Sequence, residues 1–163
     1  MKDSKLENVE IIIVQTDQEQ KDAFFVRDIV LTKELGFDIA SIPDEIDKRA
    51  KNVILYSQVE SEIGNLERKP LATLRFFTSN DVVKIGRVAV LKEFRGYQAG
   101  KKMMQFVENL VWNEPEYSNI KQIALSSIYD KRDFYLKLGY TIKGESYLEE
   151  GCPHIYMYKD RPQ

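Results

Sequence analysis

The chain has 163 residues, 43% of them hydrophobic and 31% charged, so it can bury one core without disulfide or metal staples and has no disordered or fibrous composition. Its 24 basic and 26 acidic side chains give a formal net charge of −2, which argues against binding nucleic acid through general basicity. The longest apolar runs, such as residues 11–14, are far shorter than the roughly 20 residues of a membrane-spanning helix.

Cysteine and histidine each occur once, as Cys152 and His154. A lone thiol cannot form an internal disulfide, and the two residues together cannot supply a zinc site. The polar residues 1–10 lack the apolar stretch of a signal peptide. We therefore expect a cytoplasmic or nuclear protein that holds no metal and contacts no membrane.

The first predicted elements are a strand and a helix. Residues 9–15 are apolar and β-branched, which is typical of a strand. Thr16 and Glu19 have the spacing of a capping box, so a helix should begin there. We expect it to run to Leu35, because Gly36 is a favoured residue just after a helix end.

The rest of the chain alternates strands with two more helices. Residues 71–77 and 81–91 flank a Thr-Ser-Asn turn, which predicts an antiparallel hairpin. A short helix is predicted over residues 131–138, ending at Gly139. The main amphipathic helix follows Gly100, with apolar residues at i, i+3 and i+4 spacing: Met103, Met104, Val107, Leu110 and Val111. The remaining strands are predicted at residues 52–58, 122–127, 140–147 and 154–159. This order predicts a single α/β (α+β) domain over residues 1–163, with a mostly antiparallel start.

Residues 95–101, between a predicted strand and the amphipathic helix, have the composition of an anion site. Gly96, Ala99 and Gly100 carry little or no side chain, so a ligand can approach the backbone, and a helix N-terminus attracts negative charge. Arg95 and Lys101 add positive charge. The loop matches neither the P-loop nor the dinucleotide-binding pattern. A phosphate or pyrophosphate site and a plain strand-to-helix turn both remain open on the loop alone.

Three separated segments resemble the GNAT superfamily of N-acetyltransferases. Residues 85–106 are similar to its acetyl-CoA-binding segment, with the signature Arg/Gln-x-x-Gly-x-Gly/Ala. Residues 134–140 resemble its Phe-Tyr-x-x-x-Gly-Phe segment, and residues 151–157 resemble the Gly-Ile-Pro-His-x-x-Met ending of a subgroup of small bacterial and fungal members. The resemblance spans residues 9–159 and implies a mixed, mostly antiparallel central sheet with splayed middle strands and helices on both faces.

The resemblance implies acetyl-CoA or CoA as co-substrate, lying between residues 87–91 and 122–127. The pyrophosphate would rest on the amides of residues 95–101, and the pantetheine arm would pair with a strand edge. A backbone N–H of that strand would face the thioester oxygen. The residues expected to bind the cofactor are Val88, Ala89, Val90, Arg95, Gly96, Tyr97, Gln98, Ala99, Gly100 and Lys101.

Three residues depart from the family pattern. Gln98 stands where the signature has its central Gly, at a cost of about 1 kcal/mol if its φ is positive. Lys131 replaces a small Ala, and Ile128 replaces an Asn that often contacts the cofactor. These departures keep open an alternative function as a non-catalytic CoA-binding module.

The implied reaction is direct transfer of an acetyl group to a primary amine. Tyr135 matches the family's acid position and would protonate the leaving thiolate; a core aromatic is its alternative role. Glu34 and His154 are the candidate bases. The alternatives are that Glu34 is a solvated charge at a helix end and that His154 is a strand histidine hydrogen-bonded to the backbone. A water-mediated route without a dedicated side chain is also open. Glu149 and Glu150 are predicted to face solvent.

The acceptor is expected to be a small-molecule or peptide amine, bound near residues 37–51 and 146–152. The first of these loops contains four acidic residues: Asp38, Asp44, Glu45 and Asp47. A cationic acceptor is one hypothesis for this loop, and an ordinary solvated loop is the other. The superfamily resemblance leaves a homodimer open.

Overall fold

The structure is a computed structural model that describes residues 6–40 and 42–163. Residues 1–5 of the polar start, and Ser41 in the predicted acceptor loop, lie outside this description. The chain forms two compact units: the first is Met1–Arg75 with Arg87–Phe106, and the second is Phe76–Gly86 with Val107–Gln163. Each unit is described by itself, and the expected single-domain organisation stays a prediction.

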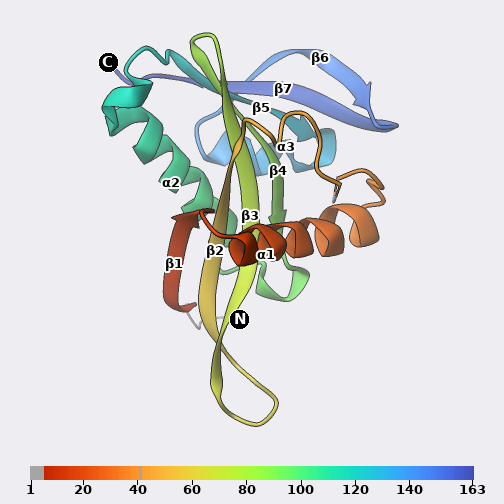
Figure 1. Ribbon diagram of the computed structural model, residues 1–163. Helices are drawn as coiled ribbons and strands as arrows, with labels where there is room; N and C mark the ends of the chain where they lie inside the picture. Colours follow the sequence, from red (N-terminus) through yellow and green to blue (C-terminus); the bar gives the residue numbers. More distant parts are fainter. Residues whose placement is uncertain (1–5, 41) are drawn as a thin grey trace. The chain divides into compact units, whose positions relative to one another are not determined.

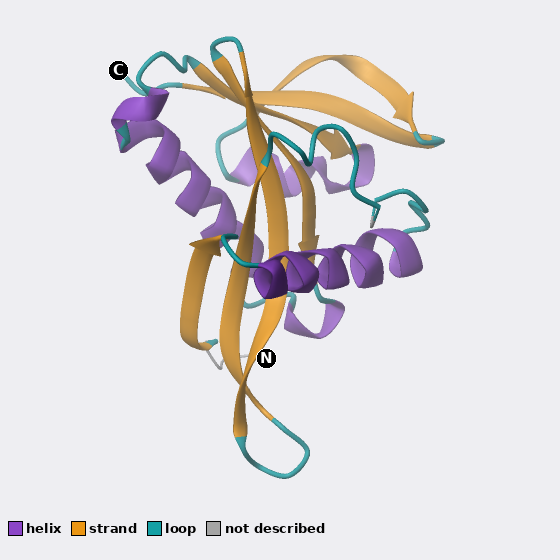
Figure 2. Cartoon of the chain, viewed as in Figure 1, coloured by secondary structure: helices purple, strands orange, loops and turns teal. Residues whose placement is uncertain are grey.

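The strands form a seven-stranded sheet in the order β1-β2-β3-β4-β5-β7-β6. The predicted class, a mixed and mostly antiparallel sheet with helices, is confirmed. Figure 2 shows the strands and helices along the chain. None of the helices in the described ranges is both long and apolar enough to cross a bilayer.

The first unit is built on β1 (Glu7–Ile13), which pairs antiparallel with β2 (Lys51–Glu60). The following helix, α1 (Asp17–Arg27), begins with the predicted capping box. Figure 1 shows α1 crossing β2, and Ala23 of α1 packs in one buried cluster with Ile54 and Tyr56 of β2. This burial of the apolar helix face fixes α1 on the strands.

The predicted helix over residues 17–35 changes its winding halfway. After α1 the chain continues as η1 (Asp28–Glu34), a π-helical segment in which Leu35 N–H donates to the carbonyl of Val30 at 3.1 Å. Val30 packs with Ala89 and Leu91 in a buried cluster, so η1 is held against the end of β4 (Val82–Val90). The π-helical winding was not predicted, because helical periodicity does not separate it from an α-helix.

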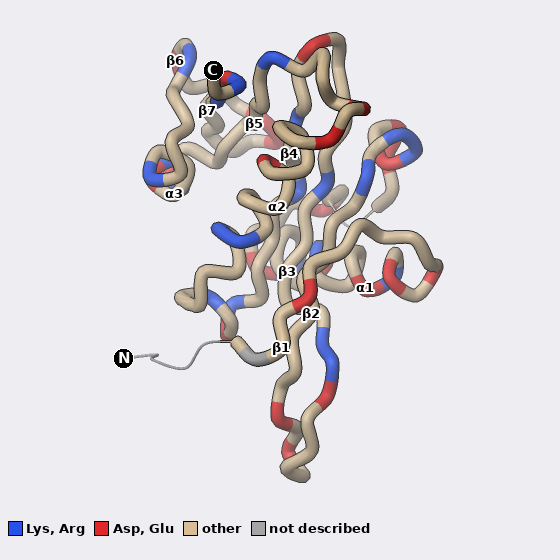
Figure 3. The backbone as a smooth tube through the Cα atoms, turned by 90° about the vertical axis from the view of Figure 1, so that its left-hand side faces the viewer, with Lys and Arg blue, Asp and Glu red and all other residues tan. Residues whose placement is uncertain are grey.

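The predicted hairpin is confirmed, because only Asn80 and Asp81 separate β3 (Leu66–Ser79) from its sheet neighbour β4. Asn80 takes the left-handed conformation that such a short turn favours, with φ +55°. At its other end, β3 meets β2 in a hairpin along which both acidic and basic residues occur (Figure 3). Charges of this kind keep an extended hairpin soluble.

The second unit holds β5 (Gln122–Ile128), which pairs parallel with β4 from Val82 opposite Gln122 to Ile85 opposite Leu125. On its other side β5 pairs antiparallel with β7 (Cys152–Asp160), and β7 pairs with β6 (Thr141–Glu149). The short helix α3 (Arg132–Lys137) follows β5. The splay of the middle strands stays a prediction.

Helix α2 (Ala99–Asn113) is the predicted amphipathic helix. It begins earlier than the sequence suggested, because the carbonyl of Gln98 accepts a hydrogen bond from Lys102 N–H at 3.0 Å. Met103, Met104 and Val107 are buried, as their spacing predicted.

Candidate functional site

The loop before α2 has an unusual backbone. Gly96 has φ +89° and Gln98 has φ +65°, so both residues lie in the left-handed region. A Cβ built on Gly96 would meet no heavy atom within 4 Å, which shows that the backbone there is open on its side-chain face. Positive φ at such positions turns backbone N–H groups into a concave arrangement suited to an anion. Gln98 therefore has the positive φ that would explain a glycine at this position of the family signature.

The N–H groups of this loop are largely unused by the protein. Of the amides at the start of α2, that of Lys102 donates to Gln98. Five others have no acceptor in residues 6–40 and 42–163: those of Gly96, Gln98, Ala99, Gly100 and Lys101. Because the first turn of a helix leaves its donors unsatisfied, these groups can receive an oxyanion.

Arg95 connects this loop to η1 and to β4. Its guanidinium donates to both carboxylate oxygens of Glu34, at 2.6 and 2.7 Å, and its Nε donates to the carbonyl of Val90 at 3.0 Å. The hydrogen bond to Glu34 raises the pKa of Arg95 further. The structure thus brings two predicted site residues together, but as a bidentate ion pair. Glu34 is a positioning partner of Arg95 here, and its role as a base stays a prediction.

The end of β4 presents alternating environments. Ala89 is buried, while Val88 and Val90 are half-buried. Just before them, Arg87 has φ +51°, a left-handed conformation inside a strand. Such strain in a bulky residue persists only where surrounding contacts enforce it, and it is frequent at functional sites. The predicted pairing of this segment with a pantetheine arm stays a prediction.

Tyr135 lies on α3 in the second unit, and 9% of its surface is exposed. Its ring meets Phe134 edge-on, with ring centroids 4.9 Å apart, and lies 6.1 Å from Tyr140. Burial raises the pKa of its phenol well above the usual range. The hydroxyl is therefore protonated at neutral pH and is a weaker acid than an exposed phenol, and its role as the proton donor stays a prediction.

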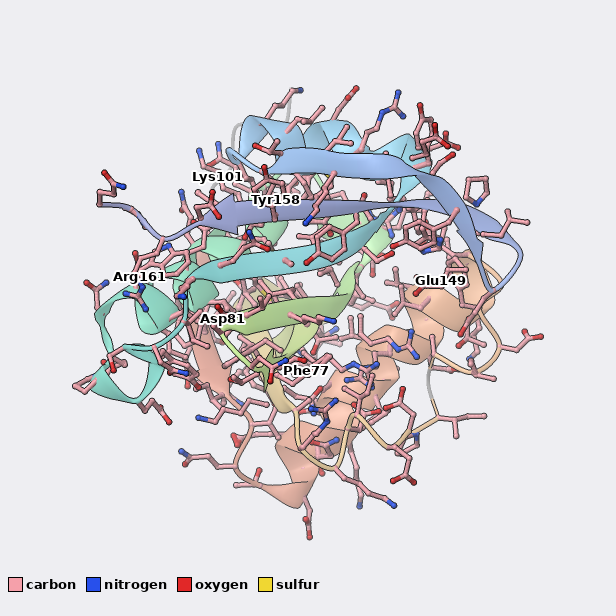
Figure 4. All side chains as sticks on the ribbon, turned by 90° about the horizontal axis from the view of Figure 1, so that it is seen from above. Phe77, Asp81, Lys101, Glu149, Tyr158 and Arg161 are labelled. Atoms are coloured by element: carbon pink, nitrogen blue, oxygen red, sulfur yellow. The ribbon has the colours of Figure 1, made fainter. Side chains whose placement is uncertain are left out.

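His154 lies near the start of β7, and each of its ring nitrogens faces an acceptor. Its Nδ1 lies 2.8 Å from the carbonyl oxygen of Cys152, and its Nε2 lies 3.3 Å from Glu149. Figure 4 places Glu149 near the tip of the β6–β7 pair. Glu149 also accepts a hydrogen bond from Ser126 at 3.3 Å, and the Ser126 hydroxyl contacts that of Tyr147.

Glu149 is exposed, as predicted, and it is also linked to His154. Its carboxylate is half-exposed but paired. The sequence signal was the Glu150-Gly151 dipeptide, both members of which have positive φ, as a two-residue turn requires. That turn places Glu149 opposite Cys152, and Tyr147 opposite His154.

The acidic loop of residues 37–51 is neutralised by arginines that sequence reasoning missed. Arg27 is fully buried and pairs with Asp47 at 2.9 Å. Arg75 pairs with Asp44 at 2.7 Å and with Asp47 at 3.1 Å. Burial by itself would raise the pKa of each aspartate, but the arginine hydrogen bonds and charges hold both pKa values below their usual range. Two of the four acidic residues are thus unavailable to a cationic acceptor.

A family model described as an acetyltransferase (GNAT) domain matches residues 47–161. The uncharacterised N-acetyltransferase YjcF of Bacillus subtilis (strain 168) is 26% identical over 150 residues, which cover 91% of this chain and 98% of YjcF. An acyl-CoA N-acyltransferase structure from Pseudomonas aeruginosa has a TM-score of 0.74 and 20% identity, over 93% of this chain and 99% of that one. An aminoglycoside 6′-N-acetyltransferase solved with coenzyme A has a TM-score of 0.59 and 15% identity, over 93% and 98%.

Proposed function

Because the chain belongs to the acetyltransferase (GNAT) family, we propose that it transfers the acetyl group of acetyl-CoA to a primary amine by direct attack on the thioester. The observation that carries this proposal is the set of unused N–H groups in the loop before α2. A plain strand-to-helix turn has no need of left-handed backbone at two positions in three residues, whereas an anion cradle does.

In the proposed complex the coenzyme A pyrophosphate accepts hydrogen bonds from the amides of Gly96, Gln98, Ala99, Gly100 and Lys101. The dipole of α2 adds about half a positive charge at this end. Since Arg95 is paired with Glu34, its part is to hold the loop against η1 and β4. The pantetheine arm pairs with Val88 and Val90 as an added strand, and a backbone N–H there stabilises the negative charge that develops on the thioester oxygen.

In the proposed reaction the amine nitrogen bonds to the acetyl carbonyl carbon and the carbon–sulfur bond breaks. An alkyl ammonium has a pKa near about 10, so a base must first take its proton. We assign that role to His154: its Nδ1 lies 2.8 Å from the carbonyl oxygen of Cys152 and its Nε2 lies 3.3 Å from Glu149, so a proton taken up by the ring would be held between two acceptors. Tyr135 gives its proton to the departing thiolate of coenzyme A.

Turnover of a primary-amine panel with acetyl-CoA tests this function, followed as coenzyme A release. We expect Tyr135→Phe to lower kcat about 100-fold, because it removes the proton donor, while KM for acetyl-CoA is kept. The matched control is Tyr140→Phe, which removes a hydroxyl that donates to Glu108 at 3.0 Å and should cost stability rather than kcat.

Two results would overturn the assignment in different ways. Binding of acetyl-CoA without turnover of any amine would favour the non-catalytic CoA-binding module. Absence of acetyl-CoA binding in calorimetry would remove both functions together.

A further inference from the structure

Three arginines and two aspartates form one ion-pair cluster at the acidic loop. Arg27, Arg75 and Arg87 surround Asp44 and Asp47, all within the first unit. Three guanidinium groups against two carboxylates leave one positive charge uncompensated within this cluster. A partly buried cationic excess is costly unless an anion offsets it.

Both aspartates already accept several close hydrogen bonds. Asp44 accepts two hydrogen bonds from Arg75, at 2.7 and 3.1 Å, and one from the amide of Asp47 at 2.9 Å. Asp47 accepts two from Arg27, at 2.9 and 3.2 Å, and one from the amide of Asp44 at 3.0 Å. Arg87 contacts Asp44 at a longer distance than Arg75 does.

Arg87 is therefore the arginine with the weakest partner. Within residues 6–40 and 42–163, its contact with a carboxylate joins Nη2 to Asp44 at 3.5 Å, the outer limit for a hydrogen bond, and its side chain is 22% exposed. Its Nε is buried and has no acceptor among the residues that the structure describes, as is also true of the Nε atoms of Arg27 and Arg75. Because part of the Arg87 side chain is exposed, an anion can approach its guanidinium and be a stronger partner than Asp44.

The backbone conformation of Arg87 also favours a functional role for this residue. Its left-handed conformation, φ +51°, is a strained state for a long side chain within a strand. The next residue is Val88, beside which the proposed function places the acetyl thioester. A group held by the Arg87 side chain would thus lie close to the acetyl carbon.

We propose that Arg87 binds a carboxylate of the acceptor, so that the substrate class is an amine that also carries a carboxylate, such as a free amino acid. This inference rests on the proposed function. One leftover positive charge matches a monoanion, and the planar fork of a guanidinium matches a carboxylate. Asp44, which Arg75 holds by an ion pair, positions Arg87, and the amine lies beside the thioester.

Matched acceptors test this inference. Each amino acid in a panel is compared with its carboxamide, which keeps the amine and the side chain and loses only the negative charge. For wild-type protein we expect kcat/KM to favour the acid by about 10- to 100-fold, the effect of hydrogen bonds between charged groups. In Arg87→Gln this preference should fall to near unity, with the loss in the KM of the acid.

Two variants separate binding from folding. Arg87→Lys keeps the charge without the fork and should restore part of the preference. Arg68→Gln removes an exposed guanidinium that pairs with Glu10 at 3.3 Å elsewhere in the first unit, and it should leave the preference unchanged. Arg87→Gln keeps a non-glycine residue at the strained φ, so its backbone cost is the same as that of the arginine.

Direct binding distinguishes this inference from the function on which it rests. Calorimetric titration of the acids and amides into the protein with coenzyme A needs no turnover. Acid-selective binding that Arg87→Gln abolishes would uphold the subsite even if no acetyl transfer is detected. Equal use of acids and amides by an active wild-type enzyme, or an acid preference that survives Arg87→Gln, would overturn the subsite and leave the transferase standing.

Discussion

Gln98 holds a backbone conformation that disfavours any residue with a side chain. Its φ of +65° costs roughly 1–2 kcal/mol for an L-residue, whereas glycine reaches it freely but loses about 0.5–1 kcal/mol in chain entropy on folding. We expect Gln98→Gly to raise the free energy of unfolding by up to about 1 kcal/mol. Urea denaturation at neutral pH measures the change.

The control for this prediction is Gln105→Gly. Gln105 is exposed within α2, where glycine lacks any conformational advantage and should lower the free energy of unfolding by about 1 kcal/mol. If both substitutions destabilised the protein to the same extent, the conformation at Gln98 would carry no strain.

Residue-level prediction succeeded where the signal was local. The positive φ of Gln98 followed from its place in a short motif, and the capping box of Thr16 and Glu19 from spacing alone. The pairing of Glu149 with His154 depended on strand register across a hairpin, and that of Glu34 with Arg95 on packing of η1 against β4. Spacing in the sequence does not report such contacts, so these charges were read as solvated or catalytic.

At the level of elements, the contacts of Asp47 and its partner Arg27 connect four segments. It links the acidic loop to Arg27 at the end of α1 and to Arg75 on β3, while Arg27 also donates to Asn52 on β2 at 2.5 Å. Asp47→Asn leaves two buried arginines with one carboxylate. We expect the free energy of unfolding at pH 7 to fall by about 3–5 kcal/mol, as for other broken buried ion pairs. Asp38→Asn, on an exposed position of the same loop, should change it by less than about 0.5 kcal/mol.

The same ion pairs predict an acid-sensitive fold. The pKa values of Asp44 and Asp47 are lower in the folded chain than in the unfolded one, where an aspartate titrates near about 3.9. Their stabilisation is therefore complete above that value and is lost as the pH falls through the folded pKa values. Unfolding curves recorded from pH 6 downward should show a steeper loss for wild type than for Asp47→Asn, and parallel curves would contradict the assignment.

Element types were more predictable than their winding and joints. The strands and the amphipathic face of α2 follow from hydrophobic patterning, because one face of each must be buried. The π-helical η1 was not visible, since its extra residue per turn is enforced by packing of Val30 and Leu31 against Ala89 and Leu91. That change of winding accompanies the approach of Glu34 to Arg95.

For the whole molecule, the fold class followed from the order of elements together with the three family-like segments, since no single segment specifies a sheet order. The parallel pairing of β4 with β5 was beyond pattern reading, because it joins strands separated by α2. Placing β5 between β4 and β7 requires tertiary information that hydrophobic periodicity does not contain.

Ligand-linked stability tests the proposed cofactor site on the intact protein. A ligand at 100 times its Kd adds about 2.7 kcal/mol to the free energy of unfolding, which corresponds to a rise in Tm of about 5–10 °C for a chain of this size. We expect acetyl-CoA to produce such a rise. S-acetylpantetheine carries the same thioester and arm without the pyrophosphate, so at equal concentration it should shift Tm by less than about 1 °C, because the unused amides of the loop before α2 would have no oxyanion to bind. Equal shifts from both compounds would mean that the thioester arm carries the affinity, and the loop amides would then have no part in binding.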